Sequence, residues 1–421
     1  MKTKITPMQW LLILCCSISW AGIMNTGWLA TSYYSLVQGA LGLSDNTLGT
    51  IISLMGVAGI CGYIFAGPLI DKIGSKISIT IGIITVSAVT LILLFSPAPD
   101  SIAVVCCVAM RFFGCFYTTA TMRYVAAITE IGAQGRSLGY FYAFMGGVSL
   151  LQGTIVSNII NSSSASSGLN ALLAISITEM IICLLIIIFG DKRNPFLPSK
   201  APAAAAESTK TEEPPFLQTL GVALKSRRLW FLGVVSFTTV CVQTLVTYVQ
   251  PLFTSQFGVS TGNATLIATW VNQGTLLVFG AITGILVDKL GSTSRVIALS
   301  LVSFLVSCIL VLVSPWSPSY VAIPIIGLFL IRICDSITKP GRQSMISEVG
   351  LPDNFRGCVV AFVNLVMAIP PIILGRLFGS ILTRYAGVDT GYRIIYVIFI
   401  GIAIIGFLGL WGFVRSKKEA A

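Results

Sequence analysis

Long apolar runs, most of them about twenty residues or more, follow one another along the chain with short polar stretches between them. A helix needs about 20 apolar residues to cross the ~30 Å hydrocarbon core of a bilayer, so each run predicts one membrane-spanning helix. The predicted helices cover residues 9–34, 47–70, 77–95, 101–124, 138–160, 169–190, 229–253, 266–287, 296–313, 320–339, 357–382 and 391–414. The pattern predicts an all-α membrane protein with twelve transmembrane helices.

One polar stretch is much longer than the others. Residues 191–228 contain five prolines, an alanine run and charges of both signs. Such a composition is typical of a flexible linker and cannot span a membrane. We therefore expect an N-terminal six-helix half at 1–190, a cytoplasmic linker at 191–228 and a C-terminal six-helix half at 229–421.

The polar loops of the two halves resemble each other. The pattern Gly-x-x-x-Asp-Lys-x-Gly-Ser starts at Gly67, after the second predicted helix, and again at Gly284, after the eighth. A glutamate after the fourth helix, Glu130, has a counterpart after the tenth, Glu348. Two matching sets of six helices indicate parallel repeats, with a solute site near mid-membrane between the halves. This organisation is typical of a secondary transporter.

Composition agrees with this interpretation and excludes others. The 421 residues are 55% hydrophobic and 10% charged, against about 25% charged in soluble proteins. The net charge of +11 does not indicate nucleic-acid binding, because the basic residues cluster in short loops. With no histidine, no Cys-x-x-Cys pair and no phosphate-binding loop, the chain offers no metal site, cofactor site or ATP-driven motor, and we expect no enzyme activity.

The basic residues also predict the orientation. Cytoplasmic loops of membrane proteins carry an excess of Lys and Arg. One predicted side holds only Arg384 and Arg393, whereas the other holds both termini, the linker and nearly all remaining loop cations. We therefore expect a multi-pass protein of the bacterial cytoplasmic (inner) membrane with both termini in the cytoplasm.

The repeated loop pattern resembles that of the major facilitator superfamily. In that family it forms a gating motif at the cytoplasmic ends of the helices. The resemblance assigns to this motif Gly67, Asp71, Lys72, Gly74, Lys76, Arg123, Glu130 and Arg136, and Gly284, Asp288, Lys289, Gly291, Arg342, Glu348 and Arg356 in the second half. It implies that Asp71 and Asp288 hold the cytoplasmic helix ends together when the carrier faces outward. The alternative is that the motif only fixes loop topology.

A narrower resemblance concerns two short strings in the second half. Residues 348–352 and 391–393 resemble a bacterial branch of sugar and organic-acid carriers. The family's frequent Arg-x-x-Gln-Gly element on the fourth helix is only partly present, because Phe-Phe-Gly follows Arg111. The Gly-Pro signature of drug exporters is missing from residues 144–153. The resemblance thus favours import of a polar solute over export of drugs.

Four charged residues lie deep in the predicted helices, where an unpaired charge costs at least ~2.5–3.5 kcal/mol. Arg111 and Arg332 occupy comparable depths in the two halves. They either bind an anionic substrate or have a structural, proton-modulating role. Asp335 is three residues after Arg332, so it either neutralises that arginine on the same helix face or acts as a protonatable coupling site. Glu179 is the other candidate coupling residue.

Aromatic and amide side chains of the predicted cavity helices are candidates for substrate contact, since such a lining suits a polar hydroxylated solute. The candidates are Asn25, Trp28, Tyr33, Tyr34, Gln243, Thr247, Tyr248, Asn272, Gln273 and Asn364. Many of them could equally form interfacial aromatic belts or interhelical hydrogen bonds.

These observations predict a secondary active transporter that works by alternating access. We expect a small-molecule substrate, with a sugar acid or another organic anion favoured, and cation-coupled symport with H⁺ or Na⁺. The expected partners are that solute, the cation and the lipid bilayer, with no cofactor and with the monomer as the unit. The alternative is proton-coupled efflux of amphiphilic compounds, which would favour deep acids over deep arginines.

Overall fold

The computed structural model of the chain describes residues 6–95, 100–128, 134–191, 225–290, 293–347, 349 and 356–418. Within these ranges the side chains at 67–68, 71, 126, 134–139, 276–290, 337, 339–344, 346–347, 356–358, 360–361, 364 and 417–418 are outside the description. All the regular secondary structure in the described part of the chain is helical.

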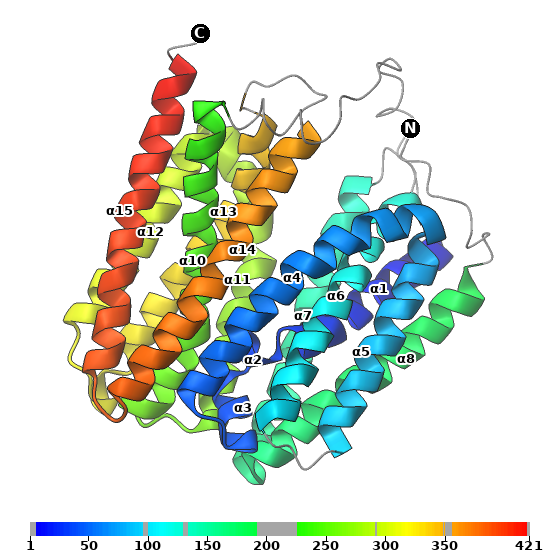
Figure 1. The fold of residues 1–421 in the computed structure, drawn as a ribbon, viewed down its shortest axis with the longest axis horizontal. Coiled ribbons are helices and arrows are strands. Elements are labelled where there is room, and N and C mark those ends of the chain that lie inside the picture. The colour runs from blue at the N-terminus through cyan, green and yellow to red at the C-terminus, as the bar shows by residue number, and fades with distance from the viewer. Residues whose placement is uncertain are drawn as a thin grey trace. The chain divides into compact units, whose positions relative to one another are not determined.

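Two compact units make up the chain. One consists of Met1–Thr209 and Thr261–Thr269, and the other of Lys210–Ser260 and Trp270–Ala421. The helices of the first half are α1 (Pro7–Gly27), α2 (Leu29–Ser32), α3 (Tyr34–Leu41), α4 (Asp45–Ile73), α5 (Ser75–Phe95), α6 (Asp100–Ile128), α7 (Gln134–Ser162) and α8 (Ala165–Gly190). Those of the second half are α10 (Arg227–Gln256), α11 (Thr261–Leu290), α12 (Thr293–Val313), the short 3₁₀ helix η3 (Pro318–Tyr320), α13 (Ala322–Ser347), α14 (Arg356–Arg384) and α15 (Thr390–Lys418) (Figure 1).

The long helices match the twelve predicted spans. In the described part of the chain, ten helices are long and apolar enough to cross a membrane. The other two long helices, α11 and α13, stand where the eighth and tenth spans are predicted. Many helical hydroxyl groups, such as those of Thr90 and Thr338, donate to the carbonyl four residues earlier. Polar side chains are thereby satisfied within their own helix, which makes them tolerable in lipid.

The first predicted span differs from expectation because it is broken. The run predicted as one helix over 9–34 forms α1, α2 and α3, with breaks at Trp28 and Tyr33 (Figure 1). Both residues leave the helical region, with φ and ψ of −123° and 24° at Trp28 and −131° and 44° at Tyr33. The apolar pattern is the same on either side of a break, so it predicts the span but not its interruption. At these two positions the Trp28 ring stacks on the Arg111 guanidinium and the Tyr33 hydroxyl bonds Asn25.

Packing within the two halves follows one scheme. In the first half α1 packs on α6, α7 and α8, and α5 packs on α6 and α8. In the second half α10 packs on α13, α14 and α15, and α12 packs on α13 and α15. Each pairing has its counterpart six spans later. The sequence duplication is therefore also a duplication of helix packing, and the halves are pseudo-symmetric.

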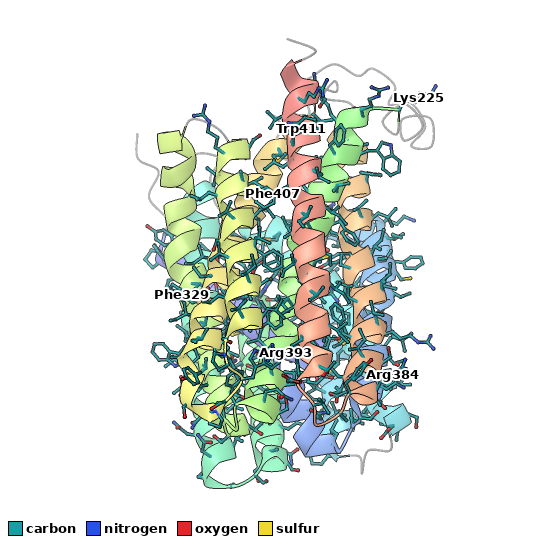
Figure 2. The ribbon with its side chains drawn as sticks, turned by 90° about the vertical axis from the view of Figure 1, so that its left-hand side faces the viewer. Lys225, Phe329, Arg384, Arg393, Phe407 and Trp411 are labelled. Carbon is teal, nitrogen blue, oxygen red and sulfur yellow. The ribbon has the colours of Figure 1, made fainter. Side chains whose placement is uncertain are left out.

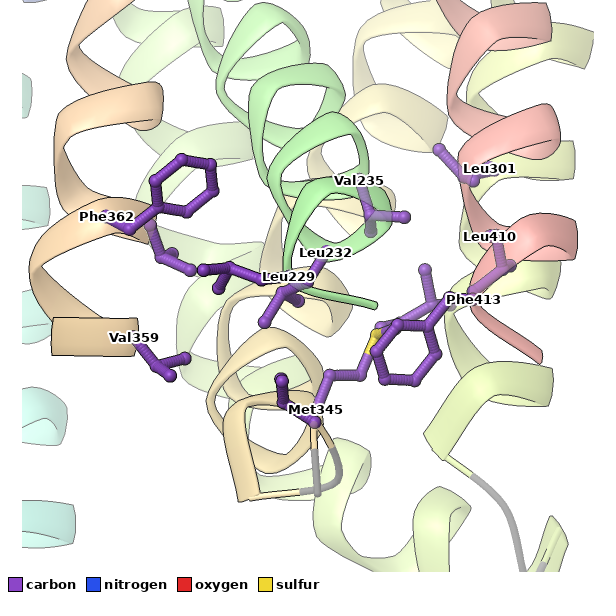
Figure 3. Packing of buried hydrophobic residues seen from close by; sticks show 12 residues of the cluster. Leu229, Leu232, Val235, Leu301, Met345, Val359, Phe362, Leu410 and Phe413 are labelled. Atoms are coloured by element: carbon purple, nitrogen blue, oxygen red, sulfur yellow. The ribbon is translucent and has the colours of Figure 1, made fainter. Parts of the chain in front are cut away.

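One end of the second unit contains an apolar cluster. Leu229 and Leu232 at the start of α10 pack with Phe362 of α14 and with Phe413 of α15 (Figure 3). Lys225 and Trp411 lie toward this end, whereas Arg384 and Arg393 lie toward the other (Figure 2). The helix ends around the cluster are thus held by close apolar packing.

Candidate functional site

Arg111 is the deep arginine of the first half and projects from the middle of α6. The carbon at the centre of its guanidinium lies 3.7 Å from the centroid of the Trp28 ring and 5.6 Å from that of the Tyr63 ring. Its Nη1 atom is buried without a hydrogen-bond partner. No described carboxylate lies within ion-pair distance of it. Aromatic faces therefore hold this cation in place without neutralising its charge.

Glycine makes room for this arrangement on α4. A Cβ atom at Gly59 would lie 3.0 Å from Nη2 and 3.1 Å from Nε of Arg111. One turn later, a Cβ at Gly62 would lie 2.7 Å from the Phe112 carbonyl oxygen. Helices α4 and α6 approach closely at these two positions because small residues allow it. Gly59 and Tyr63 are site residues that sequence reasoning missed. The sequence did contain an indication of them: Gly59, Gly62 and Tyr63 are spaced to lie on one helical face, and a neighbouring span carries Arg111.

A hydrogen-bond chain of buried polar side chains begins at Tyr33, where the first span is broken. The Tyr33 hydroxyl donates to Oδ1 of Asn25 at 3.1 Å, and Nδ2 of Asn25 donates to Oε1 of Gln152 at 2.7 Å. Nε2 of Gln152 in turn donates to Oε2 of Glu179. Tyr33 and Asn25 are each 5% exposed and Gln152 is 2% exposed. The predicted coupling residue Glu179 is thus connected to the broken first span through α7.

Close packing of α1 on α8 positions the residues of this hydrogen-bond chain. A Cβ at Gly22 would lie 2.9 Å from Cγ of Met180 and 3.0 Å from the Ser176 carbonyl oxygen. Asn25 lies one turn after Gly22 on α1, and Glu179 lies between Ser176 and Met180 on α8. No described Lys or Arg side chain lies within ion-pair distance of Glu179. An amide, and no cation, is therefore the hydrogen-bond partner that the structure gives this acid.

The deep arginine of the second half, Arg332, differs from Arg111 because it has an ionic partner. Nη1 of Arg332 donates to Oδ2 of Asp335 at 3.0 Å, and the two side chains are 12% and 4% exposed. Both residues lie on α13, three positions apart, as the sequence spacing allows. The structure thus contains the intrahelical ion pair, the first of the two alternatives for these residues. Arg332 keeps one buried atom, Nε, without a partner.

The other predicted cavity residues have varied surroundings. Tyr34 donates to Oδ1 of Asp45 at 2.7 Å, and Tyr248 donates to the Gly375 carbonyl at 3.2 Å. Both hydroxyls therefore serve contacts between spans of one half. Thr247 is buried, Gln243 is exposed on α10, and Asn272 has a buried Oδ1 without a partner. Gln273 is partly covered, and the side chain of Asn364 is outside the described part.

The predicted gating motif is described only in part. Gly74 ends α4 with φ of 84°, a conformation that favours glycine. Lys76 donates to the carbonyl oxygens of Ile188 at 3.2 Å and Asp191 at 2.6 Å. Lysine thus binds the C-terminal end of α8, where the helix dipole favours a cation. Lys72 and Arg123 are exposed, and Asp191 also accepts a hydrogen bond from Tyr124 at 2.8 Å.

The rest of the motif lies outside the described side chains. This concerns Gly67, Asp71, Glu130, Arg136, Gly284, Asp288, Lys289, Gly291, Arg342, Glu348 and Arg356. The predicted role of Asp71 and Asp288 as a latch therefore stays a prediction.

Twelve long helices in two halves of the same packing, with a deep arginine that has no ion-pair partner among the described side chains, are typical of a solute transporter of the membrane. The chain belongs to the Major Facilitator Superfamily, whose family model matches residues 9–375, and is therefore a transporter and not an enzyme. Among curated proteins it is similar to the inner membrane protein YqcE of Escherichia coli (strain K12). The two are 20% identical over 425 residues, which cover 97% of this chain and 95% of that protein. The family and the apolar helices make this chain a multi-pass membrane protein, and the curated relative is a protein of the inner membrane.

Solved structures show the same fold. The nucleoside transporter NupG has a TM-score of 0.74 at 14% identity, covering 97% of this chain and 99% of that one. A mutant of the peptide transporter POT in complex with alafosfalin has a TM-score of 0.73 at 15% identity, covering 98% of this chain and 94% of that one. The xylose transporter XylE from E. coli has a TM-score of 0.69 at 12% identity, covering 96% and 99%. At these identities the likeness concerns the fold alone.

Proposed function

We propose that this protein is a secondary active transporter that imports a small polar organic anion, with a sugar acid favoured, by cation-coupled symport and alternating access. The observation that carries the proposal is the deep Arg111 guanidinium, which has no carboxylate within ion-pair distance among the described side chains. The protein works as a monomer with both termini in the cytoplasm, and transport needs no cofactor. The orientation rests on the sequence, in which the side that holds the termini and the linker carries nearly all loop cations and the other side only Arg384 and Arg393.

The energetics favour an anionic ligand for Arg111. Burying an arginine at mid-membrane costs at least about 2.5–3.5 kcal/mol, whereas a cation–π contact returns about 0.5–2 kcal/mol. The stack on Trp28 therefore offsets only part of the cost. A carboxylate of the solute would supply both the missing charge and an acceptor for Nη1, and Arg binds carboxylates in bidentate geometry.

The two halves differ in a way that supports this assignment. Arg332 already has its carboxylate in Asp335 on the same helix. A solute anion would have to compete with that intramolecular partner. We therefore assign the anion contact to Arg111, with Trp28 as the side chain that orients it, and we place the coupling cation with the acids, Glu179 and Asp335 being the candidates.

Uptake into liposomes tests the proposal. Purified protein is challenged with labelled sugar acids, dicarboxylates, nucleosides, dipeptides, xylose and amphiphilic drugs, with and without a pH or Na⁺ gradient. We expect gradient-driven accumulation of an anion. Arg111→Gln should lose it, and Arg111→Lys should retain a small part, because the guanidinium fork is lost while the charge remains.

A second arginine on tryptophan provides the matched control. The guanidinium of Arg415 lies 5.4 Å from the Trp411 ring near the end of α15. Arg415→Gln removes the same type of contact and should transport normally. Full anion uptake by Arg111→Gln, or transport restricted to neutral or cationic compounds, would contradict the anion site.

A further inference from the structure

We propose that Glu179 binds the coupling proton and that Gln152, Asn25 and Tyr33 transmit its protonation state to the break in the first span, where Trp28 holds Arg111. The inference rests on the proposed function, because it names the coupling ion and its link to the anion site. Under it, Asn25 and Tyr33 are positioning residues and do not contact the solute.

The carboxylate sets the direction of the hydrogen-bond chain. An ionised glutamate only accepts hydrogen bonds, so the Gln152 amide must point its NH₂ group at it. The Gln152 oxygen then faces Asn25, which must donate, and the Asn25 oxygen faces Tyr33. The Tyr33 hydroxyl must donate as well. Every donor in this hydrogen-bond chain therefore points toward Glu179 as long as that acid is charged.

Protonation of Glu179 removes the negative charge that fixes these donor directions. The carboxylic acid has an O–H donor of its own, for which the amide oxygen of Gln152 is the acceptor within reach. If Gln152 turns to accept, its NH₂ group faces Asn25, which must turn in the same sense. Tyr33 then receives a donor and its own hydrogen needs a new acceptor. The protonation state of an acid on α8 thus reaches the backbone break between α2 and α3.

The break is the element most able to respond. Four residues of α2 separate its two ends, at Trp28 and Tyr33, and no side chain caps this segment. Non-helical backbone at membrane depth is tolerated only where protein or a water-filled cavity surrounds it, and transporters use such segments at their sites. The aromatic side chain at one end stacks on Arg111 and that at the other ends the hydrogen-bond chain. A change at Tyr33 therefore acts on the segment that carries Trp28.

The ionisable groups described around Glu179 include no cation within ion-pair distance of it. Cys183 on α8 lies near Glu179, and Cys15 and Cys16 on α1 lie near Cys183. On α3, Tyr34 donates to Asp45. On α5, Lys76 is bound to carbonyls at the end of α8. α7 contributes the uncharged Gln152.

Hydrogen–deuterium exchange of residues 25–41 tests the link without any solute. The full-length protein in nanodiscs is compared at about pH 5 and about pH 8, after correction for intrinsic exchange and in Na⁺-free buffer. We expect the exchange rate in this segment to differ about tenfold between the two pH values, because protonation changes a hydrogen bond to a charged group. We call this difference the pH step. Glu179→Gln should remove it, because an amide cannot titrate.

Two further variants keep the test decisive if Glu179→Gln fails to fold. Tyr33→Phe removes one hydroxyl and keeps the ring, and it should abolish the step at 25–41. Thr178→Val is the control on α8, since in the described part of the chain the Thr178 hydroxyl bonds the Ala174 carbonyl of its own helix and no other group. It should retain the full step.

Three outcomes would overturn the proposal. These are a wild-type segment with the same exchange at both pH values, a full step in Glu179→Gln or Tyr33→Phe, or a step that Na⁺ reproduces at constant pH. Failure of anion uptake in liposomes would reject the proposed substrate but leave these exchange results intact. The two proposals therefore fail separately.

Discussion

Gly59 contributes to the arginine site by having no side chain. A Cβ at this position would lie 3.0 Å from Nη2 and 3.1 Å from Nε of Arg111, closer than ordinary van der Waals contact. Gly59→Ala would push against the far end of a flexible side chain, so the free energy of unfolding should change by no more than about 0.5–1 kcal/mol. The guanidinium would leave the Trp28 face, and loss of that contact should raise KM for the anion about fivefold. The control is Gly401→Ala, where a Cβ meets nothing within 4 Å.

At this scale the sequence predicts which residues matter better than it predicts their partners. Membrane depth alone made Arg111 and Glu179 candidates, because charge in lipid is costly wherever it occurs. Their partners Trp28 and Gln152 come from other spans, and their identity depends on how those helices are rotated. Only the Arg332–Asp335 pair could be anticipated, since both residues share one helix face.

Among the elements, the junction of α4 and α5 has two lysines with different surroundings, Lys72 at the end of α4 and Lys76 at the start of α5. Lys76 bonds two carbonyl oxygens at the end of α8, whereas Lys72 is exposed. Hydrogen bonds to a charged group contribute about 1.5–3 kcal/mol. Lys76→Gln should therefore lower the thermal unfolding midpoint of the detergent-solubilised protein by several degrees, and Lys72→Gln should not. Equal midpoints in the two variants would show that Lys76 serves gating and not the stability of its own half.

The broken first span shows where pattern reasoning ends for an element. Apolar runs predict the position of a span because lipid demands length and hydrophobicity. They do not encode continuity, since the residues at 28 and 33 are as apolar or aromatic as their neighbours. The breaks at Trp28 and Tyr33 coincide with tertiary contacts, to Arg111 and to Asn25. The contact with Arg111 joins two different spans, which is beyond the reach of any local pattern.

For the whole molecule, the duplication extends to packing but not to charge. The helix pairings of the first half recur in the second, as the repeated loop motif predicts. The first half holds a cation and an acid without ionic partners among the described side chains, whereas the second half pairs its arginine within α13. A duplicated ancestor explains the common packing, because packing is what both halves need in order to fold. We infer that the charges diverged because the first half binds the ions and the second supports the scaffold.

A double-mutant cycle on α13 tests this division. Asp335→Asn leaves Arg332 buried and positive, and breaking such a pair costs about 3–5 kcal/mol, so this variant should unfold at a much lower temperature. The double variant Arg332→Gln/Asp335→Asn removes both charges and should recover most of the stability together with anion uptake. Arg111→Gln should show the opposite pattern, with stability retained and uptake lost. If the stable double variant were as inactive as Arg111→Gln, the second half would share in anion binding, and both deep arginines would belong to the site.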